Sequence, residues 1–199
     1  MTSPLNWQEF IQQADLPADA GCLSNPHQQH ALVRVTGSDA ESFLHAQFSN
    51  AVTGLESGEV RFAAWCNAKG RVWTLVRYWR DPNSQDDAII LRMPADQLED
   101  TLKRLRMFVL RSDVQLEPLN WQALQFLGPN ARLQAEQHRE NNGGTSFHIP
   151  LPAAWPLHEI WMSSASKSDL PELPKELIAL PRILAGIPEV LAEHREEWI

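Results

Sequence analysis

The stretch Ala63–Arg80 limits the fold most narrowly, because it has the pattern of a β-hairpin. Apolar and aromatic side chains recur at every second position on both sides of the turn Asn67-Ala68-Lys69-Gly70, as expected for two strands. Asparagine opens this turn and glycine closes it, which suits a connection whose last residue needs a positive φ angle. Both registers carry large apolar side chains, so we expect both faces of the hairpin to be covered for much of its length. Lys69 then lies at the tip, where it either serves a ligand or stays in water.

The segments around the hairpin alternate between strand and helix patterns. Ala31–Thr36 reads as a strand, and Ser38 followed by Glu41 predicts a capping box at the start of a helix. The apolar stripe of that helix is Phe43, Leu44 and Phe48. After the hairpin we expect the strand Ala88–Arg92, a helix with Pro94 at its first position, and the strand Ser112–Leu116 closed by Pro118.

This order predicts an α+β fold with two domains. Strand, helix, hairpin, strand, helix and strand over residues 31–117 are typical of a ferredoxin-like, split-βαβ domain. Residues 118–199 predict a second α+β domain with a mixed antiparallel sheet. Its elements are a strand at Trp121–Leu127, a helix from Pro129 to about His138, and antiparallel strands at Thr145–Ile149 and His158–Met162. Residues 1–30 predict a helix at Leu5–Ala14 and a lead-in that pack on the second domain.

Composition and charge exclude several classes of function. The net charge is −8, and an acidic chain is not attracted to a phosphate backbone, so strong direct nucleic-acid binding is not expected. Cys22 and Cys66 lie far apart, which favours a reducing compartment over a disulfide framework. There is no signal peptide, and no apolar run approaches the ~20 residues that span a bilayer. We therefore expect a soluble cytoplasmic protein with no membrane association.

The residues by themselves point to few chemical sites. Cys22, His27 and His30 lack the further ligands that zinc needs, so they predict a loop leading into a strand and no metal site. Nucleotide-binding glycine loops, nucleophile elbows and zinc-protease motifs do not occur in the sequence. One basic cluster is present, formed by Lys103, Arg104, Arg106 and Arg111. It is either a solvated helix end or an anion site for a polyglutamate tail or an RNA phosphate.

Four stretches together resemble a known family. Asn67-x-Lys69-Gly70-Arg71 is similar to the hairpin motif of the YgfZ-type folate-binding proteins, which are relatives of the glycine-cleavage T-protein, an aminomethyltransferase. Three further stretches match in the right order, namely Val33–Gln47, Leu124–Ala131 and Arg182–Glu189. The resemblance implies the N-terminal region of that family's fold.

The resemblance also implies a function. YgfZ-type proteins bind tetrahydrofolate or another folate and are implicated in iron–sulfur cluster maintenance and tRNA modification, so enzymes of those systems are the implied partners. In aminomethyltransferases a pair of aspartates follows the hairpin glycines, where a carboxylate can stabilise positive charge on nitrogen. The matching positions here are Thr74 and Leu75, which cannot do this. A folate-binding accessory protein without catalytic residues is therefore expected. The alternatives are a tetrahydrofolate-dependent transferring or demethylating enzyme and an interaction scaffold that has lost folate binding.

The folate-binding residues implied by the resemblance fall in three places. Asn67, Lys69 and Arg71 lie in the hairpin, and Arg182 and Glu189 lie in the last matching stretch. His30 and Ile178 stand at positions where family members can place a stacking aromatic residue.

The family's K-G-C-x-x-G-Q-E segment belongs about twenty residues beyond the last matching stretch, by the family pattern that the resemblance implies. The sequence stops at Ile199. We therefore expect either a fragment of a longer protein or a naturally shortened homologue, without the family's C-terminal barrel domain, and we favour the fragment.

Overall fold

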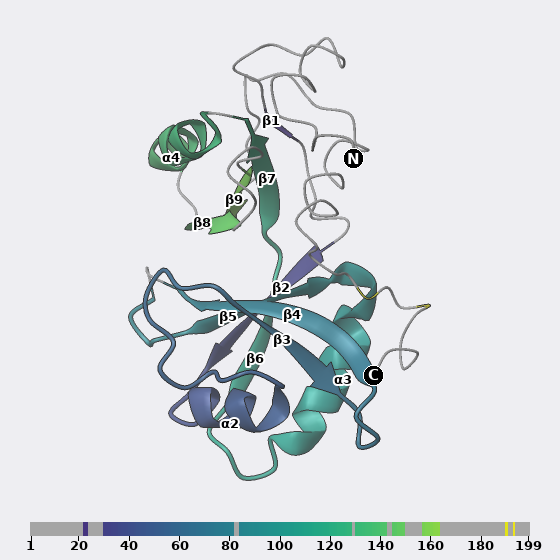
Figure 1. Ribbon diagram of the computed structural model, residues 1–199. Coiled ribbons are helices and arrows are strands. Elements are labelled where there is room, and N and C mark those ends of the chain that lie inside the picture. Colours follow the sequence, from purple (N-terminus) through teal and green to yellow (C-terminus); the bar gives the residue numbers. More distant parts are fainter. Residues whose placement is uncertain are drawn as a thin grey trace. The chain divides into compact units, whose positions relative to one another are not determined.

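The computed structural model describes residues 22–23, 30–81, 84–128, 130–142, 145–149, 157–163, 190 and 193. The chain divides into two compact units (Figure 1). The hairpin unit comprises His27–Trp121 and Glu189–Ile199, and the α4 unit comprises Met1–Pro26 and Gln122–Pro188. The division into 1–30, 31–117 and 118–199 stays a prediction. The helix predicted at Leu5–Ala14 lies outside the described residues.

The hairpin unit is built on a five-stranded sheet in which every pair of neighbouring strands is antiparallel. Its elements in chain order are β2 (His30–Thr36), α2 (Ala40–Gln47), β3 (Arg61–Cys66), β4 (Val72–Arg80), β5 (Ile89–Pro94), the 3₁₀ turn η2 (Ala95–Gln97), α3 (Leu98–Phe108) and β6 (Gln115–Leu119). The strand order is β3-β4-β5-β2-β6. The predicted hairpin and the α+β character are confirmed. The hairpin strand β3 forms one edge of this sheet as its fifth strand.

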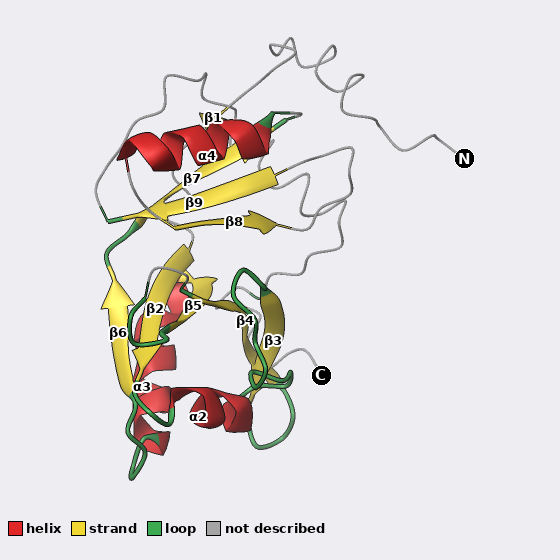
Figure 2. Ribbon diagram, turned by 90° about the vertical axis from the view of Figure 1, so that its left-hand side faces the viewer, coloured by secondary structure: helices red, strands yellow, loops and turns green. Residues whose placement is uncertain are grey.

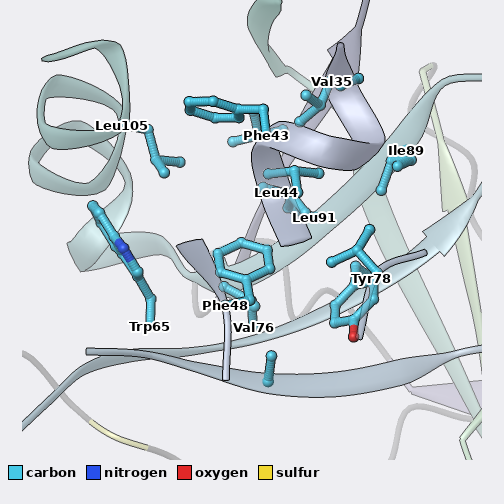
Figure 3. Close-up of a cluster of buried hydrophobic side chains, with 14 of the residues drawn as sticks. Val35, Phe43, Leu44, Phe48, Trp65, Val76, Tyr78, Ile89, Leu91 and Leu105 are labelled. Carbon is cyan, nitrogen blue, oxygen red and sulfur yellow. The ribbon is translucent and has the colours of Figure 1, made fainter. Parts of the chain in front are cut away.

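The core of this unit lies between one face of the sheet and the two helices α2 and α3. Alternate residues of each strand point to this face, as the period of two requires. Figure 3 shows Phe43 and Leu44 from α2 and Leu105 from α3 directed at sheet residues such as Leu91 and Tyr78. Trp65, Val76, Phe48, Val35 and Ile89 complete the labelled part of this cluster. The predicted apolar stripe of α2 is thus confirmed.

Three local predictions at the ends of elements are wrong. The residue before α2 is Asp39, and its side chain makes no capping hydrogen bond. Ser38 Oγ instead donates to Asp113, 3.0 Å away, and the Glu41 carboxylate accepts from the Gly54 amide and from Arg80. The expected capping box therefore does not form, because both side chains have partners distant in sequence.

The two prolines also lie elsewhere than expected. Pro118 does not close the last strand but lies within β6, opposite Val33. β6 is an edge strand, where the missing amide of a proline costs no ladder hydrogen bond. Pro94 has φ −56° and ψ 135°, so it ends β5 and precedes the helical turn η2 rather than opening a helix.

The α4 unit is a four-stranded antiparallel sheet with one helix against it. The elements are β1 (Cys22–Leu23), β7 (Gln122–Leu127), α4 (Ala131–Asn142), β8 (Thr145–Ile149) and β9 (Leu157–Met162), and the strand order is β1-β7-β9-β8. Figure 2 shows α4 lying along one face of this sheet, where Ala131 and Ala135 pack against Phe126 and Ile160. Both predicted antiparallel strands, β8 and β9, are confirmed, and α4 begins and ends later than expected.

None of the helices in the described ranges is both long and apolar enough to cross a bilayer.

Candidate functional site: the second face of the hairpin sheet

The face of the five-stranded sheet opposite α2 and α3, here called the second face, carries two arginines side by side. The strand register places Arg77 of β4 opposite Arg92 of β5. Leu32 of β2 lies opposite Arg92, and Phe62 of β3 lies opposite Arg77. One row across four strands therefore reads leucine, arginine, arginine, phenylalanine.

Leu32 and the two arginines of this row are buried although the described helices cover the other face, whereas Phe62 is 36% exposed. Arg77 and Arg92 are 5% and 3% exposed, and His30, which lies on the same face of β2, is 4% exposed. The Arg77 guanidinium lies over the ring of Phe62, with its central carbon 4.8 Å from the ring centroid. A buried guanidinium requires compensating contacts, and its planar fork of donors matches carboxylate oxygens. This row therefore sets two buried guanidiniums between the apolar side chains of Leu32 and Phe62.

The hairpin tip is rigid because Asn67 holds it by backbone and side chain. Asn67 Oδ1 accepts hydrogen bonds from the amides of Lys69 and Arg71, at 2.9 and 3.0 Å. The Gly70 amide donates to the Asn67 carbonyl over 2.9 Å, and Gly70 has the expected positive φ of 77°. Lys69 is exposed, and Arg71 is half-buried. The predicted binding residues of the hairpin thus lie together, but the amide oxygen of Asn67 is engaged in the turn.

His30 belongs to the same end of the sheet as this tip. It is the first residue of β2 and lies opposite Pro94, the last residue of β5. Since Arg77 pairs with Arg92 in an antiparallel register, the Pro94 end of β5 lies toward the Val72 end of β4, where the hairpin tip begins. Ile178, Arg182 and Glu189 lie outside the described residues.

The two positions that replace the acidic pair point to different faces. Thr74 is fully buried toward the helices, whereas Leu75 is half-buried on the second face. Among the described residues, no group of three histidine, cysteine, aspartate or glutamate side chains could hold a metal ion.

The hairpin is fastened to the loop that precedes it by Arg61. Its guanidinium donates to the carbonyls of Ala51, Thr53 and Gly54, at 3.0, 3.1 and 2.8 Å. It also binds the carboxylate of Glu59, and this hydrogen bond lowers the pKa of Glu59 below its ordinary value. The loop and strand β3 are therefore held together at the base of the hairpin.

Sequence reasoning missed Arg77 and Arg92 as candidates. A signal was present, since each arginine interrupts an otherwise apolar or aromatic strand, in VRYWR and in IILRMP. A charged residue within a strand that is expected to be buried on both faces needs a special reason.

Known proteins similar to this chain fall into one group. The chain is 26% identical over 112 residues to the tRNA-modifying protein YgfZ of Aliivibrio fischeri, a match that covers 56% of this chain and 34% of that protein. It is 25% identical over 198 residues to the mitochondrial iron–sulfur cluster assembly factor IBA57 homolog of Neurospora crassa, covering 91% of this chain and 44% of the homolog. No protein-family model matches the chain.

Among solved structures, the glycine cleavage system aminomethyltransferase T from Bartonella henselae has a similar fold. The TM-score is 0.60 at 15% identity, over 73% of this chain and 43% of the other. At this identity the likeness concerns the fold alone. The chain spans less than half the length of each of these three proteins.

Proposed function

We propose that the chain is a YgfZ-type relative of the aminomethyltransferase superfamily and that it binds a folate as an accessory protein of iron–sulfur cluster maintenance and tRNA modification. The names of two relatives, a tRNA-modifying protein and an iron–sulfur cluster assembly factor, support the two processes. Enzymes of these systems are the proposed partners. The proposed compartment is the cytoplasm, in keeping with two cysteines far apart in the sequence.

The observation that carries the folate proposal is the rigid hairpin tip, which presents the exposed Lys69 and the half-buried Arg71. A folate joins a flat pterin to a tail that ends in carboxylates, so its site needs apolar surface and fixed polar groups. Phe62 and Leu75 offer apolar surface on the second face, and the cations of the hairpin tip suit carboxylates. In this proposal Lys69 and Arg71 add positive charge at the hairpin tip, and His30, Ile178, Arg182 and Glu189 stay proposed contacts.

The proposed role is binding rather than catalysis. Neither Thr74 nor Leu75 carries a carboxylate that could stabilise a developing cation. A tetrahydrofolate-dependent enzyme is the competing proposal, and it predicts turnover of an aminomethyl or N-methyl donor by the purified protein. A second competing proposal is an interaction scaffold that has lost folate binding.

A tryptophan-fluorescence titration with tetrahydrofolate or folinic acid, corrected for ligand absorbance, tests the proposal. The chain has eight tryptophans, and Trp73 and Trp79 lie in the hairpin itself. We expect saturable quenching. Lys69→Ala should raise the dissociation constant of the folate several-fold, because the exposed lysine at the tip attracts the ligand through its charge. Lys103→Ala is the matched control, since Lys103 is an exposed lysine in the middle of α3.

Three results would count against this function. Absence of saturable quenching by either folate overturns folate binding and leaves the scaffold. An equal loss of folate affinity in Lys69→Ala and Lys103→Ala would show that the folate does not bind at the hairpin. Folate-dependent turnover of an N-methyl donor replaces the accessory role by an enzyme.

A further inference from the structure

The C-terminal end of α3 exposes large apolar side chains that folding alone does not require. Met107, Phe108 and Leu110 are 58%, 53% and 88% exposed. They follow one another within four positions, where the helix leads into the turn before β6 (Figure 1). Contiguous exposed apolar surface of this kind marks interaction sites in soluble proteins.

The same segment is the basic cluster of an acidic protein. Lys103, Arg104, Arg106 and Arg111 flank the apolar residues in the sequence, and no acidic residue occurs from Thr101 to Ser112. The whole chain nevertheless has a net charge of −8. We name the exposed group Lys103, Arg106, Met107, Phe108, Leu110 and Arg111 the α3 tip.

The backbone of the α3 tip is held in place by side chains of the same helix that pack into the core. Leu102 and Leu105 are buried in the core, and Val109 packs against the same cluster. The Arg104 guanidinium stacks on the ring of Trp73, with its central carbon 3.4 Å from the ring centroid. The exposed side chains therefore extend from a fixed helix end, which lowers the entropy that binding must overcome.

From these observations we propose that the α3 tip docks a partner protein segment that presents apolar residues flanked by carboxylates. Methionine, phenylalanine and arginine are enriched at protein interfaces, where a buried apolar centre is surrounded by charged residues. The positive charge of the tip selects an acidic partner by complementarity. This interface is separate from the proposed folate site on the second face.

Two other kinds of occupant fit less well. Nucleic acid is recognised through many cations and several stacking aromatic residues, whereas the tip offers a single aromatic side chain, Phe108, in a chain of net charge −8. A helix that lies in a membrane surface needs an apolar face along its length, but the apolar face of α3 is buried in the core.

Fluorescence anisotropy with two labelled peptides tests this proposal. One peptide intersperses Leu and Phe with Glu and Asp, and its counterpart has Lys at every acidic position. We expect saturable binding of the acidic peptide, weakened at least about tenfold by Met107→Ser with Leu110→Ser, which equals a loss of about 1.4 kcal/mol. Lys103→Glu with Arg111→Glu should reverse the preference, so that the variant binds the basic peptide better.

The control is Leu133→Ser on α4, because Leu133 is a similarly exposed leucine, at 56%, outside the tip. Its affinity for the acidic peptide should equal that of the unaltered protein. All the substituted side chains are exposed, and circular dichroism shows whether each variant keeps its fold.

The proposal is overturned if the acidic peptide does not bind or binds all variants equally. It is also overturned if the tip substitutions abolish binding to tRNA or to phosphatidylserine vesicles while peptide binding is absent. Concentration-dependent self-association that the tip substitutions abolish would assign this surface to a second copy instead.

Discussion

Gly37 stands where no other residue fits, because the backbone approaches another turn closely. Its φ angle is 109°, and a Cβ atom there would lie 2.1 Å from the carbonyl oxygen of Asp113. We expect Gly37→Ala to lower the free energy of unfolding by more than about 2 kcal/mol, since left-handed strain and a displaced backbone both contribute. Urea denaturation measures this loss.

Gly58→Ala separates the two contributions at Gly37. Gly58 also has a positive φ, 80°, but no atom lies within 4 Å of its Cβ position. This variant should lose only about 1 kcal/mol, the cost of the backbone conformation alone. Equal losses at the two glycines would show that the close approach to Asp113 does not matter.

Asp113 binds Ser38, the residue after Gly37, through its carboxylate. This interaction makes the free energy of unfolding depend on pH. The Asp113 carboxylate accepts hydrogen bonds from the amide and the hydroxyl of Ser38, at 3.1 and 3.0 Å, and these bonds lower its pKa. A lowered pKa in the folded state stabilises the protein above the unfolded value of about 3.9, and this stabilisation disappears as the pH falls through the folded value.

Asp113→Asn should therefore lower the urea midpoint near neutral pH, and the difference from the unaltered protein should shrink below about pH 4. Urea denaturation at both pH values checks this. A difference that stays constant across the two values would contradict a role for the charge.

Glu159 is a buried carboxylate that the sequence pattern did not single out. It is fully buried in β9, where it accepts hydrogen bonds from Gln125 Nε2 at 2.5 Å and from the indole nitrogen of Trp161 at 2.7 Å. Glu159→Ala would leave both donors without this acceptor, so we expect a loss of about 2–4 kcal/mol. Denaturation followed by tryptophan fluorescence measures it, and a loss below about 1 kcal/mol would show that water replaces the carboxylate.

Within the hairpin element, the side chain of Asn67 stabilises the turn. Asn67→Ala removes the side-chain acceptor of two turn amides and should cost about 1–2 kcal/mol. Asn67→Asp keeps the acceptor and should retain most of the stability. Thermal denaturation of both variants gives the comparison, and similar losses in both would assign the effect to the amide group instead.

The strands of this fold were predictable and the ends of several elements were not. The period-two pattern and the Asn–Gly turn indicate the hairpin from neighbouring residues alone. Ser38 and Glu41 form a local capping motif, yet Asp113 and Arg80 bind them, and single-sequence patterns do not show such distant partners. Pro118 reads as a strand terminator because its edge position depends on the order of the strands.

The candidate site was predicted in part for the same reason. The hairpin tip residues are contiguous in sequence, so their proximity follows from the turn. Arg77 and Arg92 become neighbours only through the register of β4 with β5, which one sequence does not reveal. Each arginine taken singly is an unusual strand residue, and only the register shows that two buried guanidiniums lie side by side.

For the whole molecule, the net charge determines how strongly this chain can bind tRNA directly. The relative from Aliivibrio fischeri is named as a tRNA-modifying protein, whereas this chain has a net charge of −8 and one basic cluster. A protein that binds tRNA directly gains much of its affinity from cations that replace counterions. The net charge of this chain therefore favours a role in which a partner enzyme contacts the RNA.

We accordingly expect this chain to bind tRNA no more tightly than about 10⁻⁵ M at physiological salt, within the range of non-specific binding. Fluorescence anisotropy with labelled tRNA at low and physiological salt measures this, because electrostatic binding weakens steeply as salt rises. Binding below about 10⁻⁷ M at physiological salt would contradict the expectation. Loss of that binding in Lys103→Glu with Arg111→Glu would then assign the basic cluster to RNA rather than to an acidic protein partner.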